Sequence, residues 1–336
     1  MKIERILIIG FGSIGKRHFN IAKGKFPYAK VRVLRRLEKS DNANKDFFIY
    51  NLNDAIAFDP QIVVIANPAN FHLSSARPFI KKNRYFLIEK PISNNLDEAK
   101  KFIERCKNEN AIVQVGYNLR FLSSLKNFKN YIDEGIIGDL WSIRSEAGQY
   151  LPSWRPQYDY RKTVSAKKSL GGGVINELSH EIDYLLWIFG NIKWIRAVTS
   201  KQSDLDIDVE DSAHILMGFQ DCDNKNLIAS LNMDFIRHDR KRECIVIGSE
   251  GSLKWDGTNG TINFWKKGGT SWIELFHLDD LAESYEYEWD DLVLSYVNQT
   301  QPIINGKEGL KTLHVLFNLI KSSKSEGIIM EINNEG

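Results

Sequence analysis

The chain has 336 residues, which suggests two domains because single hydrophobic cores rarely grow beyond about 250–300 residues. Its 45 basic and 43 acidic residues nearly balance, so charge gives no reason to expect nucleic acid or a membrane surface as a partner. No apolar run approaches the roughly 18 residues of a transmembrane helix. The three cysteines lie far apart without metal-ligand spacing, so we expect a cytoplasmic protein without a metal site.

The first 120 or so residues alternate strand-like and helical patterns. Apolar runs predict strands at residues 5–9, 31–34, 47–49, 62–66, 85–88 and 112–115. Helical periodicity lies between them, at 14–25, 71–82 and 96–108. Short apolar strands alternating with helices predict a parallel sheet of the Rossmann type, covered on both faces.

The pattern changes after Tyr117. A helix is expected over 122–134, a long polar and aromatic segment over 149–170, and another helix over 174–189. Strands with turn signals at 221–224, 248–251 and 267–269 follow, and a last helix covers about 307–325. We therefore expect an α/β fold whose second domain is α+β with a largely antiparallel, open-faced sheet. The predicted domains are 1–120 and 121–336, although the final helix could return to the first.

The first predicted strand ends in a G-x-G-x-x-G motif. Gly10 permits a tight turn, Gly12 lets the backbone approach a pyrophosphate, and Gly15 lets the next helix pack closely on the strand. That helix would begin near Ser13 and Ile14 and offer free N–H groups to phosphate oxygens. Because the motif joins a strand to a helix, it predicts a dinucleotide site.

The second strand ends in two arginines, Arg35 and Arg36, where NAD sites usually carry an acidic residue. The nearest acid is Glu38. Two guanidinium groups suit the 2′-phosphate of NADP, so the sequence favours NADP over NAD. The alternative is that both arginines face solvent.

Three further motifs follow along the chain. Residues 65–72 contain an Asn-Pro pair and a histidine, residues 89–91 read Glu-Lys-Pro, and residues 171–183 carry three glycines before a His-x-x-Asp pattern. With the opening glycine turn, these motifs resemble the glucose–fructose oxidoreductase, inositol dehydrogenase and rhizopine catabolism (Gfo/Idh/MocA) family. The resemblance covers essentially the whole chain, with the motifs in the same order.

The resemblance implies that Lys90 lies beside the nicotinamide and the substrate, and that His180 is the acid/base. Oxidising a carbinol carbon also removes the hydroxyl proton, which a positioned histidine accepts near neutral pH. Read alone, Lys90 fits an exposed turn and His180 a core histidine, but the ordered motifs favour the catalytic roles. The resemblance extends the cofactor site to these residues: Asn67, Pro68, His72, Glu89 and Lys90.

One position departs from the family pattern. The common pattern has an aspartate four residues before the histidine, where this chain has Asn176. Glu177 precedes His180 by three residues, and positions three apart share a helical face, so Glu177 could supply the carboxylate. Otherwise that role is absent. Asp183, three residues after the histidine, is a second candidate for holding the imidazole or a substrate hydroxyl.

Two segments are expected to contact the substrate. Tyr117, Asn118 and Arg120 follow the last parallel strand, where ligands of such sheets bind. Trp154 and Arg155 lie in the long aromatic segment and suit stacking on a sugar face and binding of an anionic group. A polar surface loop is the alternative for that segment.

We therefore expect an NAD(P)-dependent dehydrogenase or reductase that acts on a CH–OH carbon of a sugar or sugar derivative, and the resemblance suggests surface-glycan metabolism. The alternatives are a glycosidase or epimerase that oxidises its substrate transiently with bound NAD, and a non-catalytic cofactor-sensing regulator. The resemblance also implies a homodimer or homotetramer, formed through the open sheet face. Trp255, Phe264 and Trp265 could belong to that face or to an ordinary sheet-to-helix core.

Overall fold

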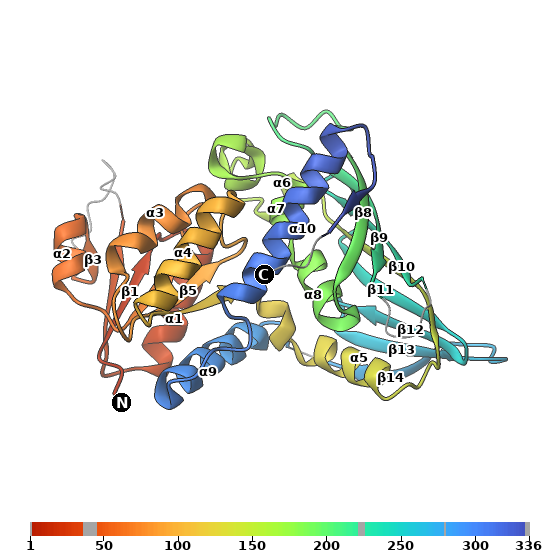
Figure 1. Cartoon of the computed structure of the whole chain (residues 1–336), viewed down its shortest axis with the longest axis horizontal. Helices are drawn as coiled ribbons and strands as arrows, with labels where there is room; N and C mark the ends of the chain where they lie inside the picture. Colours follow the sequence, from red (N-terminus) through yellow and green to blue (C-terminus); the bar gives the residue numbers. More distant parts are fainter. Residues whose placement is uncertain (1, 36–45, 221–225, 279, 333–336) are drawn as a thin grey trace. The chain divides into compact units, whose positions relative to one another are not determined.

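The computed structural model describes residues 2–35, 46–220, 226–278 and 280–332 (Figure 1). The chain divides into two compact units. The first comprises residues 1–117 and 286–313, and the second comprises 118–285 and 314–336. Within the described ranges, no helix has the length and apolar character needed to cross a membrane.

The first unit is built on a parallel sheet of six strands in the order β3-β2-β1-β4-β5-β6. The strands are β1 (Arg5–Ile9), β2 (Lys30–Leu34), β3 (Phe48–Ile49), β4 (Ile62–Ile65), β5 (Tyr85–Glu89) and β6 (Ile112–Gly116). Their centres are buried on both faces, as expected for apolar strands between two helical layers. The predicted Rossmann-type parallel sheet is confirmed.

The helices of this sheet are α1 (Ser13–Lys25), α2 (Leu52–Ala57), α3 (His72–Ala76) and α4 (Leu96–Asn108). Figure 1 shows α3 and α4 on one face of the sheet and α1 on the other. The prediction of one helix over 71–82 is wrong: α3 ends at Ala76 and a 3₁₀ turn, Arg77–Phe79, follows it. Pro78 accounts for the early end, because proline lacks the N–H that a continuing α-helix needs.

The helix α9 (Glu283–Asn298) was not predicted from the sequence, and its residues from Glu286 onward belong to the first unit. Trp289 of α9 is fully buried and donates a hydrogen bond to His18 of α1. Tyr296 packs edge-on against Tyr85, with ring centroids 5.1 Å apart. Residues 286–313 were predicted to lie in the second domain, with the return of the final helix to the first left open, and they group with the first unit.

The second unit contains a sheet of nine strands in the order β14-β13-β12-β11-β7-β10-β9-β8-β15. The strands are β7 (Leu140–Gly148), β8 (Ile192–Ser200), β9 (Ser212–Phe219), β10 (Ile228–Asp234), β11 (Lys241–Gly248), β12 (Gly251–Asp256), β13 (Thr261–Lys266), β14 (Ile273–His277) and β15 (Met330–Glu331). Neighbouring strands are antiparallel apart from β7 and β10. The predicted, largely antiparallel second sheet is therefore confirmed.

The helices of the second unit are α5 (Ser123–Asp133), α6 (Leu151–Trp154), α7 (Val174–Glu177), α8 (His180–Phe189) and the part of α10 (Gly306–Lys324) that starts at His314. The single helix predicted over 174–189 is wrong, because α7 ends at Glu177 and α8 begins at His180. The break lies at Leu178, the C-cap of α7, whose backbone (φ −98°, ψ 23°) is outside the α-helical region.

Helices α5 and α8 pack on one face of the nine-stranded sheet and form the core of this unit (Figure 1). Trp255 of β12 lies fully buried in that core, between Phe128 of α5 and Tyr184 of α8. Its indole N–H donates to Ser124 Oγ at 3.0 Å, which satisfies the buried donor. Of the two interpretations left open for Trp255, the structure supports the sheet-to-helix core.

Candidate functional site

The carboxyl ends of β1, β4, β5 and β6 form one edge of the parallel sheet, because these strands pair in register up to their last residues. Ligands of open parallel sheets bind at this edge. The residues that follow these strand ends include much of the predicted site: Gly10, Asn67, Lys90 and Tyr117.

The glycine turn after β1 requires glycine at two positions and leaves a third one open. Gly10 has φ +97°, and a Cβ there would lie 2.7 Å from the carbonyl oxygen of Ala66. A Cβ on Gly15 would lie 2.3 Å from the carbonyl oxygen of Gly10. Nothing lies within 4 Å of a Cβ placed on Gly12, the N-cap of α1, and no side chain caps that helix. The open, uncapped helix start fits a dinucleotide pyrophosphate.

Asn67, two residues after the end of β4, presents an acceptor that the described residues leave unused. Its Nδ2 donates to Ser75 Oγ at 2.8 Å, whereas its buried Oδ1 has no hydrogen-bond partner in the described ranges. A buried polar atom without a partner is costly unless a ligand or water satisfies it. Asn67 therefore fits a hydroxyl donor such as the ribose of a dinucleotide.

His72 joins two segments of the same edge. Its Nε2 lies 2.8 Å from the carbonyl oxygen of Asn67, and its Nδ1 lies 3.0 Å from that of Pro91. Burial lowers the pKa of His72 against the opposing effect of the two carbonyls, so the ring is neutral and donates its single N–H to one of them. In this arrangement His72 fixes the Asn67 segment against the Lys90–Pro91 segment.

The two arginines after β2 differ in what the structure describes. The guanidinium of Arg35 lies 5.0 Å from the ring centroid of Phe48, within cation–π range. The glycine turn is adjacent, since Gly10 N–H donates to the carbonyl oxygen of Leu34 at 3.1 Å. Arg36 lies outside the described residues.

Glu89 ends β5 and is almost entirely buried. One carboxylate oxygen accepts the backbone N–H of Lys90 at 3.2 Å, and the other lies 2.9 Å from Nε2 of His18. Gly116 leaves room for this carboxylate, because a Cβ there would lie 3.2 Å from Glu89 Oε2. Sequence reasoning missed His18. Its position one turn after the glycine motif, on the inner face of α1, is the signal that was available.

In the second unit, Asn176 is engaged with the glycine turn that precedes it. Its Nδ2 lies 3.2 Å from the carbonyl oxygen of Gly171 and 3.3 Å from that of Gly172. Glu177 and His180 are half-buried and belong to different helices, so the shared-helix argument for pairing them does not hold. The pairing itself stays a prediction.

Glu210 is a half-buried carboxyl group at the same turn, which sequence reasoning missed. Its Oε1 accepts the N–H of Ile175 at 3.2 Å and would lie 2.4 Å from a Cβ on Gly173. Burial raises the pKa of Glu210. The acidic run at 208–211, directly before β9, is the sequence signal that pointed to it.

Arg120 and Asp183, both predicted to contact substrate, form a buried, two-pronged ion pair. Arg120 Nε and Nη2 donate to the two carboxylate oxygens of Asp183 at 2.8 and 2.7 Å. Asn118 donates through Nδ2 to Ser284 Oγ at 2.8 Å. These contacts join the segment after β6 to α8 and to the first residues of α9, all within the second unit.

The aromatic segment from 149 to 170 is ordered as short helical turns. Trp154 donates through its indole N–H to the carbonyl oxygen of Gln149 at 2.9 Å and packs edge-on against Phe235. Arg155, the next residue, is exposed. The structure thus holds Trp154 in place and leaves the Arg155 guanidinium at the surface of the second unit.

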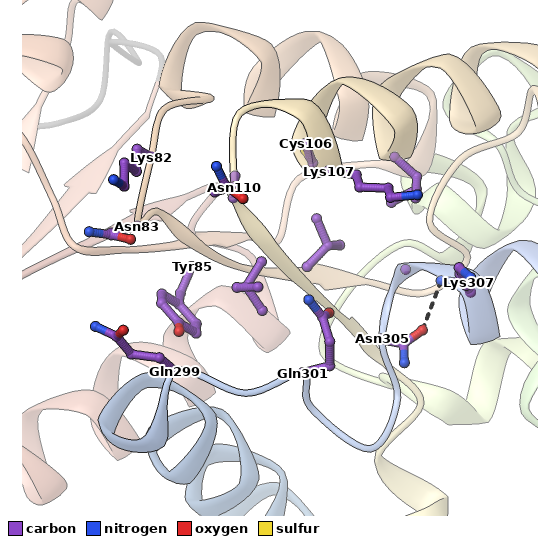
Figure 2. A pocket seen from close by; sticks show the side chains of 15 residues that line it. Lys82, Asn83, Tyr85, Cys106, Lys107, Asn110, Gln299, Gln301, Asn305 and Lys307 are labelled. Atoms are coloured by element: carbon purple, nitrogen blue, oxygen red, sulfur yellow. Dashed lines mark hydrogen bonds between the residues drawn. The ribbon is translucent and has the colours of Figure 1, made fainter.

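A pocket of about 760 Å³ lies at the opposite edge of the parallel sheet (Figure 2). Its lining includes Tyr85 and Ile112, the first residues of β5 and β6, together with lysine and amide side chains. It contains none of the predicted site residues. Among the described residues, no group of three or more His, Cys, Asp or Glu side chains is placed to hold a metal ion.

The fold defines a class: a Rossmann-type dinucleotide unit followed by a second unit with a mostly antiparallel sheet. Residues 4–117 match the family described as "Oxidoreductase family, NAD-binding Rossmann fold", and residues 125–254 match the "GFO/IDH/MocA C-terminal domain". The chain belongs to the Gfo/Idh/MocA family of NAD-binding oxidoreductases.

Relatives of known name are distant in sequence. Levoglucosan dehydrogenase of Pseudarthrobacter phenanthrenivorans is 28% identical over 209 residues, which are 57% of this chain and 53% of that protein. Myo-inositol 2-dehydrogenase of Thermotoga maritima is 24% identical over 326 residues, which are 92% of this chain and 93% of that protein. The chain spans about half the length of the first curated relatives it matches, 53% in two of them.

Solved structures share the fold over nearly the whole chain. The WlbA dehydrogenase from Bordetella pertussis, solved in complex with NADH and UDP-GlcNAcA, superposes with a TM-score of 0.82 at 18% identity. The superposition covers 99% of this chain and 100% of that one. Levoglucosan dehydrogenase in complex with NADH gives a TM-score of 0.82, also at 18% identity.

Proposed function

We propose that this protein is a nicotinamide-dependent dehydrogenase or reductase that acts on a CH–OH carbon of a sugar or sugar derivative. The observation that carries the proposal is the carboxyl edge of the parallel sheet. There, the required glycine turn, the unused acceptor of Asn67 and the Glu89–Lys90 segment follow neighbouring strands. The names of relatives, which act on inositol and levoglucosan, support a carbohydrate substrate.

The glycine turn and Asn67 would hold the cofactor, which supplies the hydride chemistry when bound. Glu89 would act from behind this edge, because its two carboxylate oxygens bond to His18 and to the Lys90 peptide. Pro68 lies beside Asn67 in the same segment. Lys90 orients the reacting hydroxyl through its ammonium group. His180 accepts the hydroxyl proton on its imidazole, and Glu177 is the proposed carboxylate that orients the ring.

Substrate contacts are proposed for Tyr117 and for residues of the second unit. Tyr117, Trp154 and the exposed Arg155 supply aromatic and cationic groups suited to a sugar with an acidic substituent. Asn118, Arg120 and Asp183 act chiefly by fixing the backbone after β6, because each is bonded within the second unit.

The turnover of variants at Lys90 and His180 tests the proposed function. The purified protein is assayed by cofactor absorbance with NAD(H) and NADP(H) against polyols, free sugars and nucleotide-linked sugars. Lys90→Met and His180→Ala should each lower kcat by about 10²–10⁴-fold, the usual contribution of positioned acid/base groups, while cofactor still binds. The control is Lys82→Met, an exposed lysine at the other edge of the sheet, which should retain full turnover. Near-normal turnover by Lys90→Met would reject the proposed role.

We further propose that NADP(H) is preferred over NAD(H). The support is the guanidinium of Arg35, which lies over Phe48 at the end of the strand beside the glycine turn. A guanidinium so placed can pair with a 2′-phosphate through charge-assisted hydrogen bonds.

Cofactor kinetics test this preference. Arg35→Ala should lower kcat/KM for NADPH by about 10-fold or more, the value of one or two charged hydrogen bonds, and leave kcat/KM for NADH within about 2-fold. Lys30→Ala, an exposed charge at the start of the same strand, is the matched control. An unmodified protein that strongly prefers NAD(H) would contradict the proposal.

We also propose a homodimer or homotetramer formed through the outer face of the nine-stranded sheet. Val198, Leu216 and Ile228 lie on neighbouring strands and are 52%, 45% and 41% exposed. Exposed apolar side chains gathered on one face favour an interface. Light scattering on the purified protein should report at least a dimer, and Leu216→Lys should shift it towards monomer.

A further inference from the structure

A buried chain of hydrogen bonds within the first unit leads from α9 to the peptide nitrogen of Lys90. The indole N–H of Trp289 donates to His18 Nδ1 at 3.0 Å. His18 Nε2 lies 2.9 Å from Glu89 Oε1, and Glu89 Oε2 accepts the N–H of Lys90 at 3.2 Å. Trp289 and His18 are fully buried and Glu89 is 8% exposed, so bulk water does not compete for these bonds.

The direction of donation in this chain is fixed by Trp289. An indole nitrogen can only donate, so His18 Nδ1 must be the acceptor. The ring proton therefore sits on Nε2 and is donated to the Glu89 carboxylate. His18 in this tautomer is neutral, and its orientation is set from the side away from Lys90.

Glu89 is charged in this environment. Burial opposes its ionisation, but the hydrogen bond from His18 and the positive charge of Lys90 hold its pKa below the ordinary value. As a carboxylate it has only acceptor oxygens, one for His18 and one for the peptide of Lys90.

A second buried carboxyl group, Glu288 of α9, has the opposite character. Burial and then the negative charge of Glu89 raise its pKa well above the ordinary value, so Glu288 is a neutral acid. Neither of its oxygens has a hydrogen-bond partner among the described residues. Two buried glutamates of one cluster thus differ in charge, and Glu89 is the one that accepts the peptide N–H of Lys90.

We propose that Glu89, oriented by His18, is a positioning residue for Lys90, which it holds by the peptide N–H at the start of the segment that carries the reacting amine. The inference rests on the proposed function in one respect, that Lys90 is the amine that acts on the substrate. It adds two residues, His18 and Trp289, that lie behind the reacting edge and touch neither cofactor nor substrate.

A contribution to stability alone does not explain why these hydrogen-bonded residues are buried here. Burying a carboxylate and an imidazole costs desolvation energy, and well-packed apolar residues of similar volume often serve stability as well or better. Small errors of placement at a reacting group, by contrast, can cost about 100-fold in rate. A rigid, directional support behind Lys90 therefore has a catalytic use.

Two amide variants of His18 separate the links of the chain. Glutamine places its amide N–H₂ near the position of Nε2, so His18→Gln keeps the donor to Glu89 and loses the bond to Trp289. Asparagine reaches only the position of Nδ1, so His18→Asn keeps an acceptor for Trp289 and loses the bond to Glu89. The two variants have the same chemistry and differ in which link they retain.

A matched pair of glutamate variants tests the charge. In Glu89→Gln one carboxylate oxygen becomes an N–H₂ group. This group is a donor, so it cannot accept the hydrogen bond of the partner that it faces, whether that is His18 or Lys90. Glu288→Gln replaces a neutral acid by a neutral amide of the same shape and should leave turnover unchanged. Both substitutions remove a buried carboxyl from the same cluster.

The measurements are kcat, cofactor Kd, Tm and the backbone amide resonance of Lys90. That resonance is observed in ¹⁵N-lysine-labelled protein without cofactor and is assigned by its loss in Lys90→Met. His18→Asn and Glu89→Gln should lower kcat by about 10- to 100-fold, with cofactor Kd within about 3-fold, and should shift the Lys90 amide. His18→Gln and Glu288→Gln should keep kcat within about 3-fold and leave the amide in place.

Equal kcat for His18→Asn and His18→Gln, or an unshifted Lys90 amide in Glu89→Gln, would overturn the inference. A lower Tm with unchanged kcat would also overturn the inference, since such a result would mean that these residues have a purely structural role. Full turnover by Lys90→Met would instead overturn the proposed function. The amide resonance would still report whether Glu89 holds the Lys90 peptide, so the two failures are distinguishable.

Discussion

At the scale of single residues, the carboxyl group of Glu288 stays protonated at a pH where an exposed glutamate is ionised. It is fully buried, and burial together with the negative charges of Glu89 and Asp291 raises its pKa well above 4.5. The unfolded chain, in which the group is solvated, releases that proton near 4.5. The folded state therefore binds one more proton than the unfolded state at neutral pH.

We predict that this proton makes stability fall as pH rises above about 4.5. A group whose folded pKa is raised stabilises the fold fully below its unfolded pKa, and that stability is lost as pH rises towards the folded pKa. Each unit between the two pKa values corresponds to about 1.4 kcal/mol. Urea unfolding of the native protein and of Glu288→Gln from pH 4.5 to 8 measures the effect.

The stability of Glu288→Gln relative to the native protein should increase steadily over that pH range. The difference between two pH values is informative even if the buried amide carries a constant cost. Parallel curves for the two proteins would show that Glu288 is ionised in the fold.

At the scale of elements, the start of α7 depends on how Asn176 holds the preceding glycine turn. The side-chain N–H₂ of Asn176 faces the carbonyl oxygens of Gly171 and Gly172 at 3.2 and 3.3 Å. Gly173 has φ +104° and lies against the half-buried carboxyl of Glu210. The turn is therefore lined by oxygen atoms, and the Asn176 amide supplies N–H donors to it.

We predict that Asn176→Asp destabilises the second unit by about 1–3 kcal/mol at pH 7, because the carboxylate would face two carbonyl oxygens. Asn176→Ala is the control, since it removes the same bonds without adding a charge, and it should be more stable than Asn176→Asp. Urea unfolding measures both. An aspartate variant as stable as the native protein would contradict the donor role of Asn176.

Elements with strong local signals were predictable from the sequence, while those shaped by distant contacts were not. The six strands of the first sheet were predicted within one residue of their bounds, and α4 was predicted with the bounds it has. The break at Leu178 was not foreseen, because both flanking segments share one apolar periodicity. Helix α9 was not foreseen, because its acidic sequence hides the spacing of Trp289 and Tyr296.

At the scale of the whole molecule, each unit encloses one fully buried tryptophan with partners in its own unit. Trp289 lies in the first unit beside His18 and Phe26, and Trp255 lies in the second beside Phe128 and Tyr184. Residues 286–313 come late in the sequence but belong to the first unit. The division into units therefore predicts in which strands each tryptophan slows hydrogen exchange.

We predict that Trp289→Ala lowers hydrogen-exchange protection in β1, β5 and β6, and that Trp255→Ala lowers it in β7, β11 and β12. Each substitution should cost about 3–5 kcal/mol, as for other large buried aromatic residues. Mass-spectrometric exchange on both variants measures the effect. Loss of protection in β7–β12 upon Trp289→Ala would contradict the assignment of α9 to the first unit.

The sequence by itself determined the dinucleotide turn, the strands that lead to its edge and the family motifs around Lys90 and His180. These signals are local, since turns and periodicities depend on neighbours a few residues apart. Only the tertiary structure decided that Glu89 meets His18 across 71 positions and that His18 meets Trp289 across 271. Such contacts depend on which buried polar groups satisfy one another once the first unit has folded, and no pattern along the chain records that choice.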